Sequence, residues 1–172
     1  MSFAACNNGS SDNKEFTVVT TLFPQYDFAR AILGEKGSAV LLLTPGSDSH
    51  NFEITPSNMQ TINKSKLFIY TGPQMEIWVD GILPSINDNV KILDLSCSVH
   101  SEAVDHDEDG HNHQDPHIWT SPIIARKMLN MIFDSICAID PENADYYREN
   151  YLKYDAELVK LDSEFRSISD NA

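Results

Sequence analysis

The sequence has few basic residues and no long hydrophobic run. Lys and Arg total 12 against 26 Asp and Glu, which gives a formal net charge of −14 over 172 residues. Such a surface repels nucleic acid phosphates and anionic lipid headgroups, so we expect neither as a partner. No apolar stretch approaches the roughly 20 residues that cross a bilayer. An acidic surface does attract cations, although acidity alone also serves solubility.

The sequence is also poor in cysteine. Its three cysteines are too few for a disulfide framework. Cys97 and Cys137 lie within apolar patterns, so we expect buried free thiols there. A bridge between them stays open outside the cytoplasm.

The third cysteine, Cys6, ends the run M-S-F-A-A-C, and residues 7–14 are polar and rich in Asn, Ser and Gly. Small residues before a cysteine, followed by a polar tether, resemble the end of a bacterial lipoprotein signal. The apolar helix expected upstream is missing, so a signal was either removed or never present. We therefore interpret residues 1–15 as a tether with Cys6 as its lipidation site; the alternative is an ordinary ragged terminus.

Alternation of apolar runs and helical patterns predicts an α/β fold. Strands are expected at residues 16–21, 39–43, 67–71 and 90–95, the second and third buried on both faces. Helices are expected at residues 24–33, from Thr55-Pro56 onward, and around 75–82. This order favours a four-stranded parallel sheet with helices on both faces. Ligands of such sheets bind beyond the carboxyl ends of the strands, which directs attention to the loops that follow them.

The last third of the sequence predicts two helices. Ser121-Pro122 begins one that ends near Ile139, and Asp140-Pro141 begins another that ends near Ser169. The second would be about 40 Å long at 1.5 Å per residue and would extend beyond a domain of this size. Its apolar stripe indicates a coiled-coil seam or a spine shared with a second lobe. The stripe comprises Tyr147, Tyr151, Tyr154, Leu158, Leu161, Phe165 and Ile168.

Residues 98–114 form a histidine- and acid-rich segment, which we predict to be a flexible loop. Imidazole and carboxylate groups together are ligands for zinc and its first-row neighbours. Mobile side chains recruit an ion but cannot hold one geometry, so we interpret His100, His106, His111 and His113 as a weak collecting site. The alternative is a solvated acidic loop with incidental histidines.

Two further histidines are candidates for an ordered metal site. His117 lies between Pro116 and a capped helix, and Asp115 is placed either to orient its imidazole or to cap a turn. His50 lies in the loop after the second strand. Loops after the second and fourth strands open at the same edge of a parallel sheet, so these two histidines can converge. Two histidines leave a zinc site incomplete. The remaining ligands would come from water, Asp48, Glu53, Glu76, the collecting loop or another polypeptide.

Three segments resemble the zinc and manganese solute-binding proteins of ABC transporters. The run P-G-S-D-S-H-N-F-E-I-T-P-S at 45–57 resembles their first metal-histidine motif, and D-P-H-I-W-T-S-P at 115–122 resembles the second. K-L-F-I-Y-T-G-P-Q-M-E-I-W-V-D at 66–80 is also similar, and the His-rich segment resembles the loop of the zinc branch. The similarity extends over residues 16–165.

The resemblance implies two α/β lobes joined by a long helix, with the metal in the cleft between them. Carried over by motif, His50 and His117 are the metal ligands of a first lobe at residues 16–140, and residues 141–169 are the connecting helix. The second lobe, with its third histidine and a carboxylate, is expected to be absent from this sequence. Ser49 stands where some zinc members have an acidic residue, so that ligand is missing as well.

The sequence therefore predicts extracytoplasmic capture of zinc, or of manganese, for a membrane ABC permease. The protein would lie in the periplasm or at the cell surface and would contact the membrane only through a lipid anchor at Cys6. One alternative is a free-standing metal buffer or chaperone. Another is a zinc hydrolase, which the absence of H-E-x-x-H and of a convincing general base disfavours, so we expect no enzyme.

Overall fold

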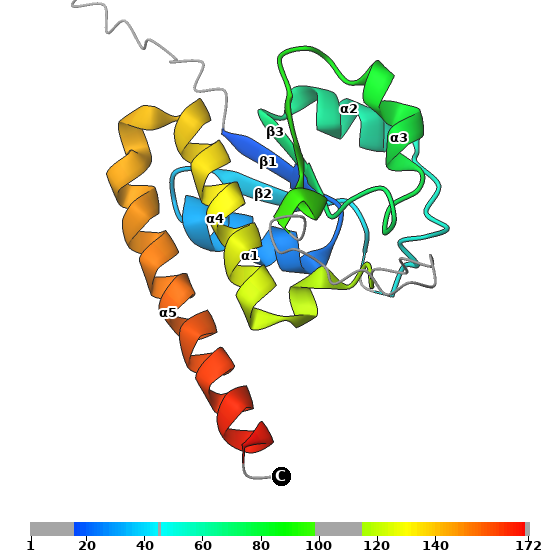
Figure 1. Ribbon diagram of the computed structural model, residues 1–172. Coiled ribbons are helices and arrows are strands. Elements are labelled where there is room, and N and C mark those ends of the chain that lie inside the picture. The colour runs from blue at the N-terminus through cyan, green and yellow to red at the C-terminus, as the bar shows by residue number, and fades with distance from the viewer. Residues whose placement is uncertain (1–15, 45, 99–114, 171–172) are drawn as a thin grey trace, which may run out of the picture.

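The computed structural model describes residues 16–44, 46–98 and 115–170, and it contains the predicted four-stranded parallel sheet (Figure 1). The strand order is β2-β1-β3-β4, with every neighbouring pair parallel. The strands are β1 (Thr17–Thr20), β2 (Ser38–Leu41), β3 (Leu67–Tyr70) and β4 (Lys91–Asp94). Because all four strands are parallel, the loops that follow them open at the same edge of the sheet.

In the described part of the chain, five α-helices cover the two faces of this sheet (Figure 1). On one face, α1, α4 and α5 enclose a core that receives Val18, Leu67 and Ile69 from the strands. On the other, α2 and α3 enclose a core that receives Val19, Phe68 and Tyr70. The helices are α1 (Phe23–Leu33), α2 (Pro56–Lys64), α3 (Val79–Ile82), α4 (Pro122–Ile139) and α5 (Ala144–Ser169). Short 3-10 helices are η1 (Leu83–Ser85), η2 (Leu95–Ser98), η3 (Ile118–Thr120) and η4 (Pro141–Asn143).

Helix boundaries follow the capping residues of the sequence. The Thr55 hydroxyl accepts a hydrogen bond from the Asn58 backbone N–H, and Pro56 occupies the first turn of α2. Ser121 caps α4 in the same way, and α4 ends at Ile139 as predicted. No helix in the described part of the chain has the length and apolarity needed to cross a bilayer.

Three expectations about local structure are wrong. Strand β2 is only half-buried, because it lies at the edge of the sheet. The apolar run continues past the end of the strand into Leu42 and Leu43, which are buried. Helix α3 is four residues long rather than extending over 75–82, because residues 72–79 form hydrogen-bonded turns. Cys97 is exposed and Cys137 half-buried, so the expected burial is wrong, whereas both are free thiols as expected.

The beginning of the last helix also differs from expectation. Residues 141–143 form η4, and α5 begins at Ala144. The Asp140 carboxylate accepts hydrogen bonds from the side chains of Asn143 and Tyr147 instead of capping α5. Asp140 therefore joins the end of α4 to the first turn of α5, where Tyr147 is completely buried.

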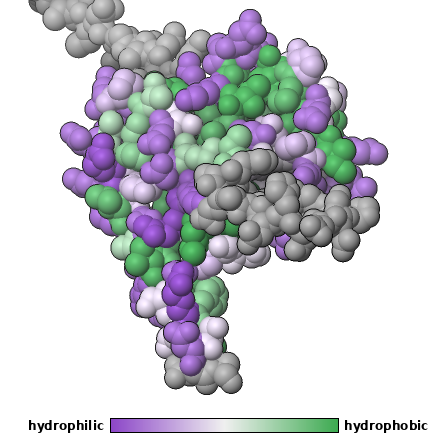
Figure 2. All heavy atoms as spheres, viewed as in Figure 1, coloured by the Kyte–Doolittle hydropathy of each residue, from purple (hydrophilic) through white to green (hydrophobic). Residues whose placement is uncertain are grey.

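Helix α5 packs on the body only over its first half. Tyr154 packs edge-on against Phe28, with ring centroids 5.3 Å apart, and its hydroxyl donates to Asp27 of α1 at 2.6 Å. Further along, the apolar stripe is uncovered: Leu161 is 39% exposed, Phe165 50% and Ile168 68%. In Figures 1 and 2 this end of α5 projects from the body as a narrow stalk. The predicted overhang is therefore confirmed.

A buried carboxylate joins the carboxyl ends of the two central strands. Glu76 has no exposed surface, and its oxygens accept hydrogen bonds from the backbone N–H groups of Thr71 and Gly72 and from the Thr21 hydroxyl. Gln25 extends the network, because its amide donates to the Thr71 hydroxyl and accepts from Thr21. Burial raises the pKa of Glu76, and the hydrogen bonds oppose that shift.

Glu76→Gln should destabilise the fold by about 1–3 kcal/mol, because the amide turns an N–H toward the backbone N–H donors of residues 71 and 72. The exposed Glu53→Gln is the control and should change the free energy of unfolding by less than about 0.5 kcal/mol. Since folding raises the pKa of Glu76, its pH-dependent contribution is fully present below about pH 4 and is lost as pH rises. In denaturant unfolding, the free energies of unfolding of the wild type and of Glu76→Gln should therefore differ more at about pH 4 than at about pH 7. A difference that grows toward neutral pH would contradict this account.

Substitutions along α5 should separate its packed half from its projecting half. Tyr147→Ala should lower the free energy of unfolding by about 3–5 kcal/mol, because it leaves a cavity in the core and removes the hydrogen bond to Asp140. Phe165→Ala should lower the free energy of unfolding by less than about 0.5 kcal/mol, because half of that residue is exposed. Thermal and denaturant unfolding of the two variants measure the contrast. A comparable loss in Phe165→Ala would mean that the stalk is covered in solution.

Candidate metal centre

The predicted ligand His50 lies exposed in the loop that follows β2. Its backbone N–H donates to the carboxylate of Asp48 at 2.9 Å, and the Asn51 amide donates to the same carboxylate at 2.6 Å. The hydrogen bond from Asn51, followed by that from His50, lowers the pKa of Asp48. The carboxylate therefore stays ionised and holds the backbone of His50 from within its own loop.

A residue from outside this loop also holds it. The Trp78 indole N–H donates to the carbonyl of Ser49 at 3.0 Å, and its ring lies 5.1 Å from that of Phe52. Trp78 directly precedes α3 and packs against the core beneath α2 and α3. The His50 segment is thus attached to the scaffold on both sides of the histidine.

The second predicted ligand, His117, is held by its own neighbours. The Asp115 carboxylate contacts the imidazole Nδ1 at 2.7 Å and accepts from the His117 backbone N–H at 2.9 Å. These two hydrogen bonds lower the pKa of Asp115, which keeps the carboxylate ionised. A neutral imidazole that donates from Nδ1 to this carboxylate keeps its lone pair on Nε2. Asp115 therefore makes the contacts of both alternatives, one with the imidazole and one that caps the turn.

Short-range contacts also fix the backbone at His117. Its carbonyl accepts from the hydroxyl and the backbone N–H of Thr120 at 2.7 and 3.1 Å, which forms η3. Trp119 lies edge-on to the imidazole, with ring centroids 5.4 Å apart. The His117 side chain is still 49% exposed, so the imidazole is not enclosed by these contacts.

Both histidines lie on the side of the sheet where the strands end. In Figure 1 the strands run toward the lower right, and the loop after β2 and the segment leading into α4 are drawn on that side. Within residues 16–44, 46–98 and 115–170, no group of three or more His, Cys, Asp or Glu side chains is placed to hold a metal. The described residues thus offer two imidazoles rather than a complete coordination shell.

The three carboxylates considered as further ligands have different surroundings. Glu76 is buried and occupied by the hydrogen bonds that join β1 and β3. Asp48 holds His50 and Asn51, and Glu53 is exposed on the same loop. The predicted collecting residues His100, His106, His111 and His113, together with Cys6, lie outside the described residues.

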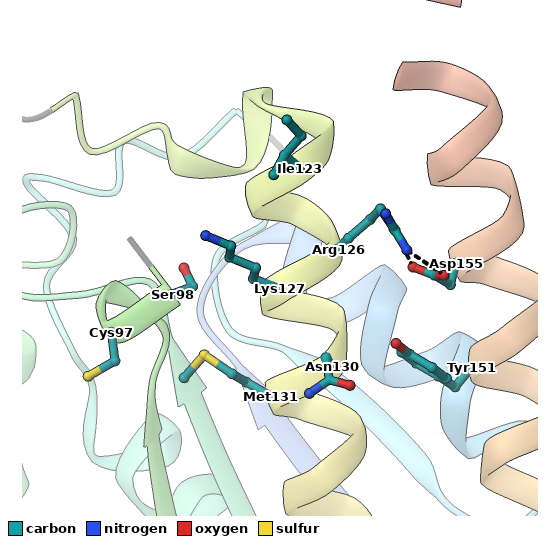
Figure 3. Close-up of a pocket in the computed structure, with 9 residues that line it drawn as sticks. All are labelled: Cys97, Ser98, Ile123, Arg126, Lys127, Asn130, Met131, Tyr151 and Asp155. Atoms are coloured by element: carbon teal, nitrogen blue, oxygen red, sulfur yellow. Dashed lines mark hydrogen bonds and ion pairs between the residues drawn. The ribbon is translucent and has the colours of Figure 1, made fainter. Parts of the chain in front are cut away.

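A cavity of about 500 Å³ lies between η2, α4 and α5 (Figure 3). Arg126 of α4 turns toward Asp155 of α5 and donates to both of its oxygens, at 2.6 and 3.0 Å. The cavity is lined by Cys97, Ser98, Ile123, Arg126, Lys127, Asn130, Met131, Tyr151 and Asp155. Because this lining has no histidine and its carboxylate is paired with a guanidinium, the cavity is separate from the candidate metal ligands.

Sequence reasoning missed the contact of Trp78 with the His50 loop. The only signal was an aromatic residue with a polar N–H in the segment E-I-W-V-D, and such a group needs a hydrogen-bond partner when it is partly buried. The partner, 29 residues away, could not be identified from spacing.

Comparison with known proteins agrees with this architecture. Residues 18–172 match the family model described as zinc-uptake complex component A, periplasmic, or ZnuA. The high-affinity zinc uptake system protein ZnuA of Bacillus subtilis is 34% identical, over 98% of this chain and 58% of its own length. The crystal structure of the metal-dependent lipoprotein YcdH from Bacillus subtilis superposes with a TM-score of 0.80 at 32% identity, over 92% of this chain and 57% of that one.

A third similarity is to the Zn(II)-bound ZnuA-like domain of AdcA from Streptococcus pneumoniae. Its TM-score is 0.73 at 27% identity, over 87% of this chain and 54% of that chain. The sequence thus spans little more than half the length of each of these three proteins. Since the family model covers residues 18–172 and a 34%-identical relative covers 98% of the sequence, the chain belongs to the ZnuA family of periplasmic zinc-uptake components.

Proposed function

We propose that this chain captures zinc outside the cytoplasmic membrane for delivery to an ABC importer, and that His50 and His117 are its ordered ligands. The observation that carries the proposal is the pair of exposed imidazoles on loops at the carboxyl side of one parallel sheet, one of them with its Nδ1 on a carboxylate. A histidine that donates from Nδ1 to a carboxylate offers Nε2 as a ligand when it is neutral, which is the form that binds zinc.

Two imidazoles fill half of a tetrahedral zinc shell. The remaining positions would take water or groups from outside the described residues, such as the third histidine and the carboxylate that the family resemblance implies for a second lobe. Because the open positions serve further ligands and release of the ion, we expect transport without catalytic turnover. Glu76 is unsuited to act as a general base, since its oxygens accept hydrogen bonds within the core.

The segments beyond the described residues complete the proposal from sequence. Residues 98–114 would collect hydrated ions through His100, His106, His111 and His113 and pass them to the ordered pair. Cys6 would anchor the protein at the outer side of the membrane through a lipid, next to the permease. Imidazole density favours zinc, and manganese is the second candidate ion.

A zinc titration read at each histidine tests the shared site. In proton–nitrogen NMR spectra of the imidazoles, at free zinc set by a chelator buffer, His50 and His117 should respond with one common dissociation constant. His50→Ala should weaken the response of His117 on the order of tenfold or more, because the ion loses one of its ligands. His106→Ala is the matched control and should leave the response of His117 unchanged.

Two results would contradict the shared site. Different dissociation constants at His50 and His117 would mean that they do not hold the same ion. An unchanged response of His117 in His50→Ala would mean the same.

Removal of residues 99–114 should lower the number of zinc ions bound and slow capture, because the deletion removes four histidines and five carboxylates. Calorimetry gives the stoichiometry, and stopped-flow mixing with a zinc indicator gives the rate. The dissociation constant at His117 should stay within about twofold of the intact chain, because its local contacts are retained. Loss of all zinc binding in this variant would overturn the collecting role and place the binding in the segment itself.

A further inference from the structure

We propose that Trp78 is the positioning residue for His50, and that its indole N–H sets the orientation of that histidine for the metal. This inference rests on the proposed role of His50 as a ligand and adds a residue to the site. Trp78 would not touch the ion; it acts through the Ser49 carbonyl and through Phe52.

The peptide group between Ser49 and His50 links Trp78 to the histidine. Its carbonyl oxygen accepts from the Trp78 indole at 3.0 Å, and its N–H donates to the Asp48 carboxylate at 2.9 Å. Both polar ends of one planar unit are therefore held, and the plane cannot turn without breaking a hydrogen bond. The Cα–Cβ direction of His50 follows from that plane and one backbone torsion, so the indole bond restricts where the imidazole points.

The two bonds differ in what they fix. Asp48 lies two residues from His50, so its bond shapes the loop internally and moves with it. The hydrogen bonds between Thr44 and Ser47 and between Asp48 and Asn51 are equally local. The bond from Trp78 joins residues 29 positions apart, so it relates the loop to the scaffold. Ser49 is 7% exposed, so this bond is shielded from competing water.

Trp78 is itself fixed by the core. The turn before it is held by hydrogen bonds from the Met75 and Glu76 backbone N–H groups to the Gly72 carbonyl, and by the Glu76 carboxylate on the N–H groups of residues 71 and 72. The contact between the Trp78 and Phe52 rings adds a second connection to the loop, two residues after His50. A continuous series of contacts thus connects the buried ends of β1 and β3 to the backbone of His50.

Replacing only the N–H of Trp78 tests the proposal. Site-specific incorporation of 3-benzothienylalanine keeps the size and shape of the ring system and substitutes sulfur for the donor. Trp78→Phe is the genetic counterpart, which keeps an aromatic contact with Phe52 and lacks the donor. Ile132→Val, in the opposite core, controls for a general loss of stability.

The measurement is the zinc dissociation constant from the imidazole resonances of His50 and His117, alongside the thermal midpoint of each variant. Both Trp78 variants should raise the common dissociation constant on the order of tenfold, as loss of groups that orient a metal ligand does. Ile132→Val should leave the dissociation constant within about twofold, including where it lowers the thermal midpoint as much as Trp78→Phe does. The imidazole resonances of His50 in the zinc-free protein should also move in the Trp78 variants.

The outcomes separate this inference from the proposed function. If His50→Ala weakens zinc binding at His117 and both Trp78 variants leave it unchanged, the positioning role is wrong and the ligand role stands. If His50→Ala leaves zinc binding at His117 unchanged, the ligand role fails and the positioning role fails with it. If Ile132→Val weakens binding as much as the Trp78 variants at equal loss of midpoint, the effect is one of stability and the positioning role is wrong.

Discussion

The buried carboxylate of Glu76 is the interaction on which the side of the sheet that carries His50 and His117 depends. Backbone N–H groups at the end of β3 and the Thr21 hydroxyl after β1 all donate to it, where the chain leaves the sheet and these groups have lost strand partners. Burying a carboxylate costs free energy, as its raised pKa shows, and the hydrogen bonds offset that cost. The tight turn that results presents Trp78 to the loop of His50.

The two candidate ligands are therefore positioned by different means. His117 is held by Asp115 and Thr120, which lie within three residues, so its orientation is specified by a short segment. His50 depends on Trp78 and hence on the packing of the whole sheet edge. Anything that loosens the turn after β3 should affect His50 first and leave His117 oriented. With one ligand oriented locally and the other oriented by the fold, such a site can lose the orientation of one ligand while the protein stays folded.

The sequence was sufficient for features set by local chemistry. Thr55 and Ser121 predicted the beginnings of α2 and α4, and the contact of Asp115 with His117 followed from a separation of two residues. Features set by long-range contacts were missed. The half-buried state of β2 depends on its place at the sheet edge, and the shortness of α3 depends on where the Glu76 side chain folds back. The bond from Trp78 to Ser49 joins two segments whose separation carries no periodic signal.

The central claim is that one zinc ion bridges His50 and His117. Anomalous diffraction at the zinc edge, from crystals grown with one equivalent of zinc and with His100, His106, His111 and His113 replaced by Asn, tests it most directly. The account predicts one strong peak about 2.0–2.1 Å from a ring nitrogen of each histidine, with the Nδ1 of His117 still on Asp115. A peak bound to one histidine alone, or to neither, would contradict it.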